Sequence, residues 1–255
     1  MLEVTPIPVL SDNYTWLLRA PQGDTAVVVD PGEAAPVAKA LEAMGVKLAA
    51  IMITHHHTDH VAGIEGLIGN GLPVYGPADS PIPFISDPVK PGETLAPPGL
   101  GPTFDVLGVP GHTLDHLAFF GDGLLFAGDA LFAGGCGRMF EGTPAQMQGY
   151  LSALRKLPGE TRLYCGHEYT LANLTFALAV EPDNVALQAR HAQIEQQHAR
   201  GAITLPSTLA EECATNPFLR WDVEAVIQSA EAQAGHALND PIDVFAALRA
   251  WKDRF

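Results

Sequence analysis

The amino-acid sequence predicts an α+β protein in which short strands come first and helices follow. Up to about residue 170, short apolar runs rich in β-branched and aromatic residues alternate with Gly, Pro and Asp turns. After Tyr169 the strand pattern stops, and segments with helical spacing follow one another. Strands followed by helices are typical of the α+β class. We therefore expect two domains, residues 1–170 and residues 171–255, the second of them helical.

Each predicted strand is a short, mostly apolar run that ends at a turn residue. These runs are 14–18, 25–29, 48–53, 73–75, 104–107, 117–120, 124–126 and 162–165. Two helices are expected between them, over residues 34–44 before Gly45 and over residues 143–157 with Thr143 at the N-cap position. In the second domain, helices are expected over 171–180, 184–198, 223–234 and 242–251.

The composition excludes several classes of protein. A net charge of -15 with 14 Lys and Arg residues argues against a nucleic-acid surface, which needs clustered cations. No apolar run is long enough to span a membrane, so we expect no membrane partner. The 3 cysteines form no Cys-x-x-Cys pair, and the first residues lack the pattern of a signal peptide. We therefore expect a cytoplasmic protein with free thiols.

The segment from Thr54 to His60 is the most informative part of the chain. It reads Thr-His-His-His-Thr-Asp-His and directly follows the apolar strand predicted at 48–53. A strand that ends in such a loop delivers several nitrogen and oxygen ligands to one place. Imidazole and carboxylate together suit zinc, iron or manganese. A solvated turn with structural histidines is the alternative, and the density of ligands favours a metal site.

Three further ligand types follow predicted strands in the same way. His112, Asp129 and His167 each come shortly after a strand, and a glycine directly precedes each of them. Glycine lets the backbone turn sharply or approach another group closely. The repeated order of strand, glycine and ligand predicts that these loops meet at one metal centre.

With these motifs the sequence resembles the metallo-β-lactamase superfamily and, within it, the glyoxalase II (hydroxyacylglutathione hydrolase) family. The segments that carry the resemblance are 12–16, 54–60, 110–113, 128–129, 135–138, 165–170, 181–184, 216–220 and 249–252. They extend over nearly the whole chain. The resemblance implies a four-layer αββα sandwich followed by a C-terminal helical domain.

The resemblance also implies a binuclear metal site. One metal would be held by His55, His57 and His112, the other by Asp59, His60 and His167, and Asp129 would bridge the two. We expect two divalent ions per chain, zinc in the first place, with iron or manganese as alternatives. Asp59 and Asp129 are the expected catalytic residues. His56 would support the loop, His116 would be structural, and His191, His198 and His236 would be solvated histidines on helices.

The activity implied is hydrolysis of the thioester of S-(2-hydroxyacyl)glutathione, such as S-lactoylglutathione, to glutathione and a 2-hydroxy acid. This is the second step of methylglyoxal detoxification. A hydroxide formed from water between the two ions would attack the carbonyl. A mononuclear-iron persulfide dioxygenase is the alternative on the same scaffold, and a non-catalytic metal-binding module is another. Metal analysis with assays of hydrolysis and oxygen uptake would separate them.

Glutathione is anionic, so local cations must bind it in this acidic protein. By the family pattern the contacts would be Arg138, Tyr169, Arg249 and Lys252, with Arg249 and Lys252 on one face of the last helix. Two positions depart from the pattern, because many members have Lys at 138 and Tyr where this chain has Phe140. These departures affect the expected affinity rather than the reaction. Glu168 is expected to be structural, and we expect a monomer.

Overall fold

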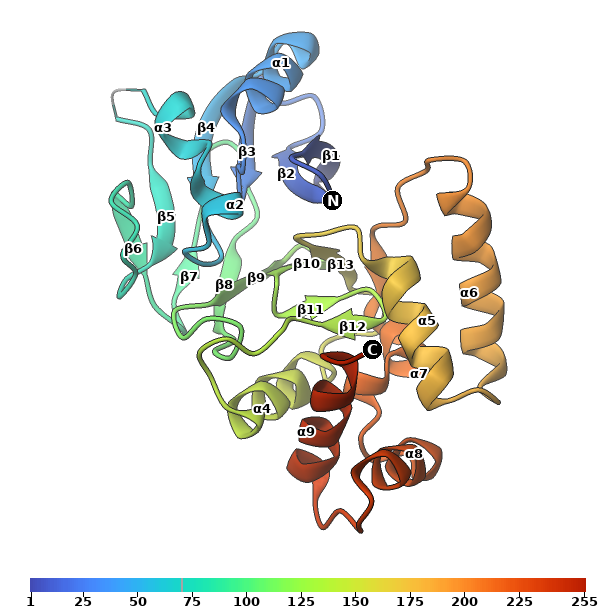
Figure 1. Ribbon diagram of the computed structural model, residues 1–255. Helices are drawn as coiled ribbons and strands as arrows, with labels where there is room; N and C mark the ends of the chain where they lie inside the picture. Colours follow the sequence, from blue (N-terminus) through green and yellow to red (C-terminus); the bar gives the residue numbers. More distant parts are fainter. Residues whose placement is uncertain (70) are drawn as a thin grey trace. The chain divides into compact units, whose positions relative to one another are not determined.

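The computed structural model describes residues 1–69 and 71–255, and the chain falls into two compact units (Figure 1). The sheet unit comprises residues 1–109, 115–128 and 164–167. The helical unit comprises residues 110–114, 129–163 and 168–255. The α+β class is confirmed, because one unit is rich in strands and the other in helices. The domain boundary expected at residue 170 stays a prediction.

The first sheet of the sheet unit has the order β1-β2-β3-β4-β5-β6. Its strands are β1 Glu3–Val9, β2 Asn13–Arg19, β3 Thr25–Val29, β4 Lys47–Met52, β5 Val74–Pro77 and β6 Asp87–Val89. The first three pair antiparallel, whereas β3 to β6 run parallel. Parallel neighbours need a crossover, and α1 (Ala34–Met44) supplies it between β3 and β4. Gly45 ends α1 in the left-handed conformation, with a φ of 64°.

The sequence does not predict the two edge strands of this sheet, and both contain proline. Pro6 and Pro8 lie in β1, and Pro88 lies in β6. Proline has no N–H to donate to a neighbouring strand, so within sheets it is confined largely to edges. The prolines that obscure these strands in the sequence are therefore consistent with their edge positions.

The second sheet places β13, β10, β9, β8 and β7 side by side. Its strands are β7 Thr94–Leu95, β8 Phe104–Gly108, β9 Leu117–Gly121, β10 Leu124–Gly128 and β13 Arg162–Cys165. The pairs from β7 to β10 are antiparallel. All of these strands except β7 are predicted from the sequence, and β7 is too short to show alternation.

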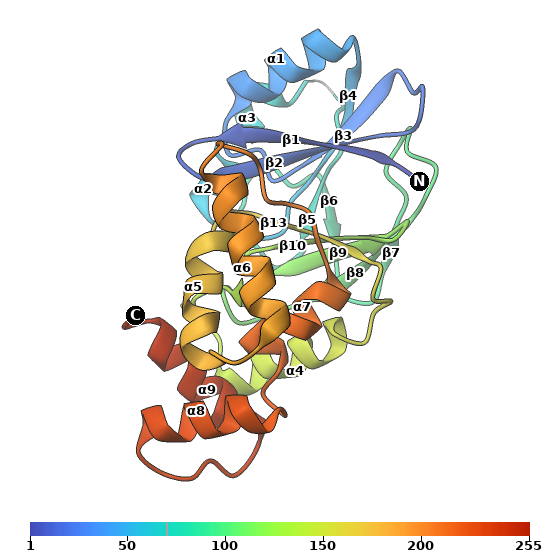
Figure 2. The ribbon, with the colours of Figure 1, turned by 90° about the vertical axis from the view of Figure 1, so that its right-hand side faces the viewer.

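Three layers follow one another in the sheet unit: the helices α1 and α3 (Ile64–Leu67), the first sheet and the second sheet (Figure 2). Between α1 and the first sheet, buried Val37 belongs to one core cluster with Leu17 and Ile51. Between the two sheets, the Trp16 ring lies against Tyr164 with centroids 4.9 Å apart, and its Nε1 donates to the Cys165 carbonyl at 2.9 Å. This face-to-face packing of sheets is the sandwich expected for the metallo-β-lactamase fold.

The helical unit is built from α-helices of 7 to 14 residues, a 3-10 helix of 3 residues and very short strands. The helices are α4 Pro144–Leu154, α5 Thr170–Val180, α6 Val185–His198, α7 Leu209–Thr215, η1 Pro217–Leu219, α8 Glu224–Ala234 and α9 Pro241–Lys252. The strands are β11 Leu131–Phe132, β12 Gly135–Cys136 and β14 Ser207–Thr208. The expected cap of α4 is confirmed, because Thr143 accepts from the Gln146 amide and forms a capping box with that residue.

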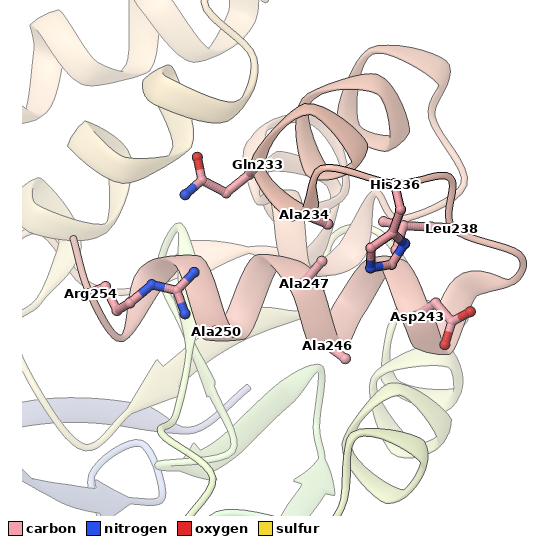
Figure 3. A pocket seen from close by; sticks show the side chains of 9 residues that line it. All are labelled: Gln233, Ala234, His236, Leu238, Asp243, Ala246, Ala247, Ala250 and Arg254. Atoms are coloured by element: carbon pink, nitrogen blue, oxygen red, sulfur yellow. The ribbon is translucent and has the colours of Figure 1, made fainter.

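Two pairs of neighbouring helices organise this unit. The helices α5 and α6 lie side by side in both views and share a buried cluster that includes Leu174, Leu187 and Ile194 (Figures 1 and 2). The helices α8 and α9 also pack together, and a shallow pocket beside them is lined by small side chains such as Ala247, with His236 and Asp243 at one end (Figure 3). None of the predicted site residues lines this pocket.

The structure corrects two expectations for this region. A strand does occur after residue 170, because β14 pairs with the first half of β13. It has two residues, too few for any alternation to be visible in the sequence. His236 does not lie on a helix, since α8 ends at Ala234 and Gly235 turns the chain with a φ of 79°. Within the described part of the chain, no helix has both the length and the apolar character needed to cross a bilayer.

Candidate metal centre and substrate contacts

The predicted ligand loop of the sheet unit follows β4 and leads into the single turn of α2 (Thr58–Val61). Its start is fixed by Asp30, which lies at the end of the neighbouring strand β3. The Thr54 amide and hydroxyl both donate to the Asp30 carboxylate, at 2.8 and 2.7 Å. Parallel neighbours end at the same edge of a sheet, so β3 supplies the carboxylate that orients the loop after β4.

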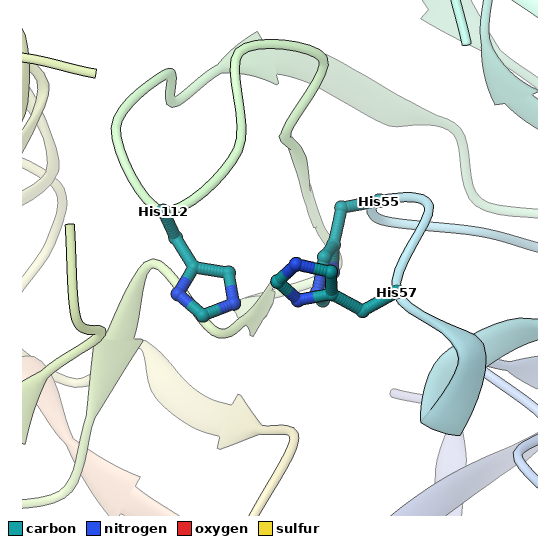
Figure 4. Close-up of side chains that lie close together, drawn as sticks. All are labelled: His55, His57 and His112. Carbon is teal, nitrogen blue, oxygen red and sulfur yellow. The ribbon is translucent and has the colours of Figure 1, made fainter. Parts of the chain in front are cut away.

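His55 and His57 turn their rings toward each other on this loop (Figure 4). The His55 Nε2 and the His57 Nδ1 lie 3.1 Å apart. His55 is fully buried and stacks on His116, with ring centroids 4.4 Å apart. The His116 Nδ1 in turn lies 2.9 Å from the Leu117 carbonyl oxygen, so His116 has the structural environment that the sequence predicts. Figure 4 also shows His112, on the loop that follows β8.

Asp59, His60 and His167 form the second predicted ligand set, and the sheet unit brings all three together. The Asp59 Oδ2 lies 3.4 Å from the His60 Nε2 and 3.4 Å from the His167 Nε2. Ligands that bind one tetrahedral zinc at its usual bond lengths lie about 3.4 Å from each other. The donor types and their spacing therefore fit a divalent ion.

The opposite ring nitrogens of these histidines are held by carboxylates. The His60 Nδ1 lies 3.1 Å from an Asp30 oxygen, and the His167 Nδ1 lies 2.7 Å from an Asp12 oxygen. Such carboxylate partners fix the tautomer of a histidine ligand and leave Nε2 for a metal. This arrangement is a second reason why the set fits a metal ion.

Asn13 is a further supporting residue to which the sequence analysis assigns no role. Its Nδ2 donates to the Asp59 Oδ2 at 2.8 Å, and the amide of the next residue, Tyr14, donates to the Gly166 carbonyl at 2.8 Å. The start of β2 is thereby tied to the loop that carries His167. Asp12 and Asn13 belong to a segment of the family resemblance, which is the one signal that could have found them.

The hydrogen bonds around Asp59 also determine its charge. Hydrogen bonds with His167 and His60 hold the pKa of the Asp59 carboxyl well below its usual range, against the raising effect of burial. Asp59 is therefore a carboxylate at neutral pH, the form that can bind a cation or accept a proton.

His112 and Asp129, the remaining predicted ligands, lie together in the helical unit. The His112 Nε2 is 3.4 Å from the Asp129 Oδ2, while its Nδ1 is 2.8 Å from the Arg138 carbonyl oxygen. The spacing and the held Nδ1 repeat the pattern of His167 and Asp59. The Phe140 ring packs edge-on to His112 at 5.2 Å and is 60% exposed, so the position that departs from the family pattern lies beside a predicted ligand.

The predicted substrate contacts all belong to the helical unit and differ in exposure. The Arg138 side chain is largely exposed and lies near Asp253, and Tyr169 is partly exposed with its ring against Phe132. The Lys252 ammonium donates to the Ala172 carbonyl at 3.3 Å. These three side chains reach the surface.

Arg249 is the exception, because it is buried. Its Nη1 donates to the Cys136 carbonyl at 2.9 Å, and its Nη2 donates to Asp253 at 2.9 Å. Burial raises the pKa of the Cys136 thiol to about 11, so this thiol stays protonated and packs as an apolar group. The guanidinium therefore holds the loop that carries Arg138, and its contact with substrate stays a prediction.

Two other polar residues have structural partners. His56 lies 2.9 Å from Asp115 through its Nδ1, as expected for a residue that supports the loop. Glu168 accepts from the Thr204 amide at 2.9 Å, which agrees with the structural role expected for it.

The comparisons with known proteins agree with this geometry. Residues 10–167 match the model of the metallo-beta-lactamase superfamily, and residues 168–255 match that of the hydroxyacylglutathione hydrolase C-terminus. A hydroxyacylglutathione hydrolase from Alkalilimnicola ehrlichii is 54% identical over 255 residues, which is 100% of both chains. The chain belongs to the hydroxyacylglutathione hydrolase family. As members of this family are hydrolases, the non-catalytic alternative loses its support.

Two solved structures resemble the fold of this chain. ETHE1 from Myxococcus xanthus superposes with a TM-score of 0.65 at 23% identity, covering 99% of this chain and 98% of its own. TTHA1623, solved in a di-iron-bound form, gives a TM-score of 0.60 at 27% identity and covers 84% of this chain and 100% of its own. The first likeness, at 23% identity, shows the fold alone.

Proposed function

We propose that this protein hydrolyses the thioester of S-(2-hydroxyacyl)glutathione, such as S-lactoylglutathione, to glutathione and a 2-hydroxy acid. The observation that carries the proposal is the full-length identity of 54% to a hydroxyacylglutathione hydrolase, combined with histidine and carboxylate groups spaced as metal ligands. The reaction would be the second step of methylglyoxal detoxification.

We propose that seven side chains hold two divalent ions: His55, His57 and His112 one, Asp59, His60 and His167 the other, with Asp129 between them. The support comes from each unit separately. In the sheet unit Asp59 lies 3.4 Å from both His60 and His167. In the helical unit Asp129 lies 3.4 Å from His112. When bound, two such ions supply activation of water and polarisation of a carbonyl. Zinc suits these nitrogen and oxygen donors, and iron or manganese would also be accepted.

The residues of the chain then have distinct tasks. Asp59, kept ionised by its hydrogen bonds, orients the attacking water through its carboxylate. The leaving thiol has a pKa of about 8.5 by analogy with cysteine, so it departs as a thiolate without a strong acid. Arg138 and Lys252 supply positive charge for the anionic glutathione, with Tyr169 beside them, while Arg249 orders their surroundings.

We also propose that the protein is a cytoplasmic monomer. One chain supplies every proposed ligand and substrate contact, so function requires no partner subunit. Cys136, Cys165 and Cys213 are free thiols, which suits a reducing compartment. Light scattering of the purified protein would report its mass in solution, and a dimer mass would refute the monomer.

The test is hydrolysis of S-lactoylglutathione by purified protein, run beside elemental analysis. The proposal expects thioester cleavage and two metal ions per chain. One iron per chain with oxygen uptake would favour the persulfide dioxygenase alternative instead. Bound metal with neither activity would refute both.

A further inference from the structure

The hairpin of β11 and β12 links two proposed site residues, because Asp129 precedes it and Arg138 follows it. Each strand has two residues, and the register pairs Leu131 with Cys136 and Phe132 with Gly135. So short a ladder is marginal by itself. The position of Asp129 and Arg138 must therefore depend on what else holds the hairpin.

Side chains from the surrounding helices hold the hairpin by its backbone. Carbonyls along the hairpin accept from four side chains: Ala130 from Tyr150 at 3.0 Å, Ala133 from Asn173 at 3.1 Å, Phe132 and Gly135 from Asn216 at 3.3 and 3.0 Å, and Cys136 and Gly137 from Arg249 at 2.9 and 3.4 Å. All four donors are buried. They come from α4, α5, the end of α7 and α9.

Glu212 on α7 instead contacts a backbone N–H, at the tip of the hairpin. Its Oε2 accepts from the Gly134 amide at 2.7 Å and from the Asn216 Nδ2 at 3.1 Å. Its Oε1 accepts from Arg190 at 2.5 Å. The residue is fully buried, so its charge has to be compensated by these partners.

Two glycines of the hairpin lie where neighbouring groups leave no room for a side chain. Gly134 has a φ of +70°, and a Cβ there would come 2.7 Å from the Leu174 side chain. A Cβ on Gly137 would come 2.0 Å from the Asp129 carbonyl oxygen. Side chains at these positions would displace the hairpin from the groups that hold it or from Asp129.

We propose that Glu212 is a positioning residue, which fixes the β11–β12 hairpin through Gly134 and Asn216 and thereby sets Asp129 and Arg138. Arg190 pairs with Glu212 and holds it in place, so this buried ion pair serves the site as well as stability. The link to turnover rests on the proposed function and the link to metal retention on the proposed metal site, whereas the link to the hairpin rests on neither.

Glu212→Gln and Glu181→Gln form a matched pair of variants. Glu181 is equally a buried carboxylate of the helical unit, but its carboxylate accepts from Arg220, at 2.7 and 2.9 Å, rather than from the hairpin. Each substitution removes one buried charge and keeps the size of the side chain. Both variants should lower Tm, so a loss of stability alone does not distinguish positioning from structure.

The deciding readouts are hydrogen–deuterium exchange of the segment 129–138 and the retention of zinc against a chelator. In Glu212→Gln, exchange in this segment should rise about tenfold or more, and zinc affinity should fall by about 10–100-fold. In Glu181→Gln, zinc affinity should stay unchanged, and exchange in this segment should rise no more than it does in the rest of the protein. Equal exchange and equal zinc retention in the two variants would overturn the proposal.

A milder variant covers the case in which Glu212→Gln does not fold. Tyr150→Phe removes only the hydroxyl that donates to Ala130, next to Asp129. It should raise exchange at residues 129–138 and lower kcat several-fold, with KM for S-lactoylglutathione unchanged. Unchanged exchange and kcat would contradict the premise that side-chain bonds to the hairpin set Asp129, and the role of Glu212 would fall with it. If the wild type does not cleave the thioester, the proposed function fails, but exchange and zinc retention still decide the role of Glu212.

Discussion

The ligand loop at 54–60 and the hairpin at 129–138 are held in place by opposite means. In the loop, acidic side chains hold the ligand side chains themselves, as Asp30 does with His60. In the hairpin, buried side chains of the helices hold the backbone, as Glu212 does with Gly134. The first arrangement fixes the orientation of each imidazole, and the second fixes the place of a whole segment. Substitutions in the two regions should therefore fail in different ways.

The largest effect is expected for Asp129→Ala, which removes the proposed bridging carboxylate beside the hairpin. Because both ions would lose a ligand, kcat should fall by more than about 10³-fold and bound metal should be lost. Steady-state kinetics and elemental analysis measure the two effects. Asp183→Asn, at an exposed carboxylate, is the control. Full activity of Asp129→Ala would end the binuclear account.

The next effect tests the ligand loop and its partners through a matched pair. Asp12→Ala removes the carboxylate that lies 2.7 Å from His167, which is a proposed metal ligand. Asp115→Ala removes the carboxylate that lies 2.9 Å from His56, which is not a proposed ligand. Loss of such a partner of a metal ligand lowers metal affinity by about 10–100-fold. A chelator competition should show this loss for Asp12→Ala alone. Equal affinities in both variants would contradict the assignment of His167.

A smaller, pH-dependent effect is expected at Lys252. Burial, with the nearby Arg249, lowers the pKa of Lys252 to about 8. The ammonium is therefore present below pH 8 and lost above it, so KM for the anionic substrate should rise as the pH passes 8. Lys252→Met should raise KM about tenfold at pH 7 and remove this rise. The control Lys39→Met, at an exposed lysine, should leave KM and its pH dependence unchanged. A wild-type KM that stays constant from pH 7 to 9 would argue against a contact between Lys252 and the substrate.

The smallest effect is expected for Thr143→Ala at the N-cap of α4. The Thr143 hydroxyl accepts from the Gln146 amide, and loss of such a cap costs about 1 kcal/mol of stability. Tyr150 lies further along α4, so its bond to the hairpin should survive and kcat should stay unchanged. Denaturant unfolding and kinetics together measure this. A large fall in kcat would mean that the hairpin depends on the start of α4.

The ligand loop could be predicted from the sequence, because its ligands are local and follow an apolar strand. His55 to His60 lie within one segment, and His112, Asp129 and His167 share the order of strand, glycine and ligand. The supports of the hairpin could not be predicted. Glu212 lies 78 residues from Gly134 and looks like one more acidic residue of a helix.

The elements of the fold also differ in how far the sequence predicts them. Strands such as β3 and helices such as α1 have the predicted bounds, since alternation, helical spacing and Gly45 are local signals. The strands β1 and β6 could not be predicted, because their prolines are compatible with a strand only at the edge of a sheet. Edge position is a property of the folded sheet, so no local pattern reports it.

The most direct test of the binuclear account is a metal titration of the apoprotein. Metal would be removed with a chelator, zinc added back in steps, and S-lactoylglutathione hydrolysis measured at each step. The account predicts that the rate reaches its plateau at two equivalents of zinc per chain. A plateau at one equivalent, or no hydrolysis at any ratio, would contradict it.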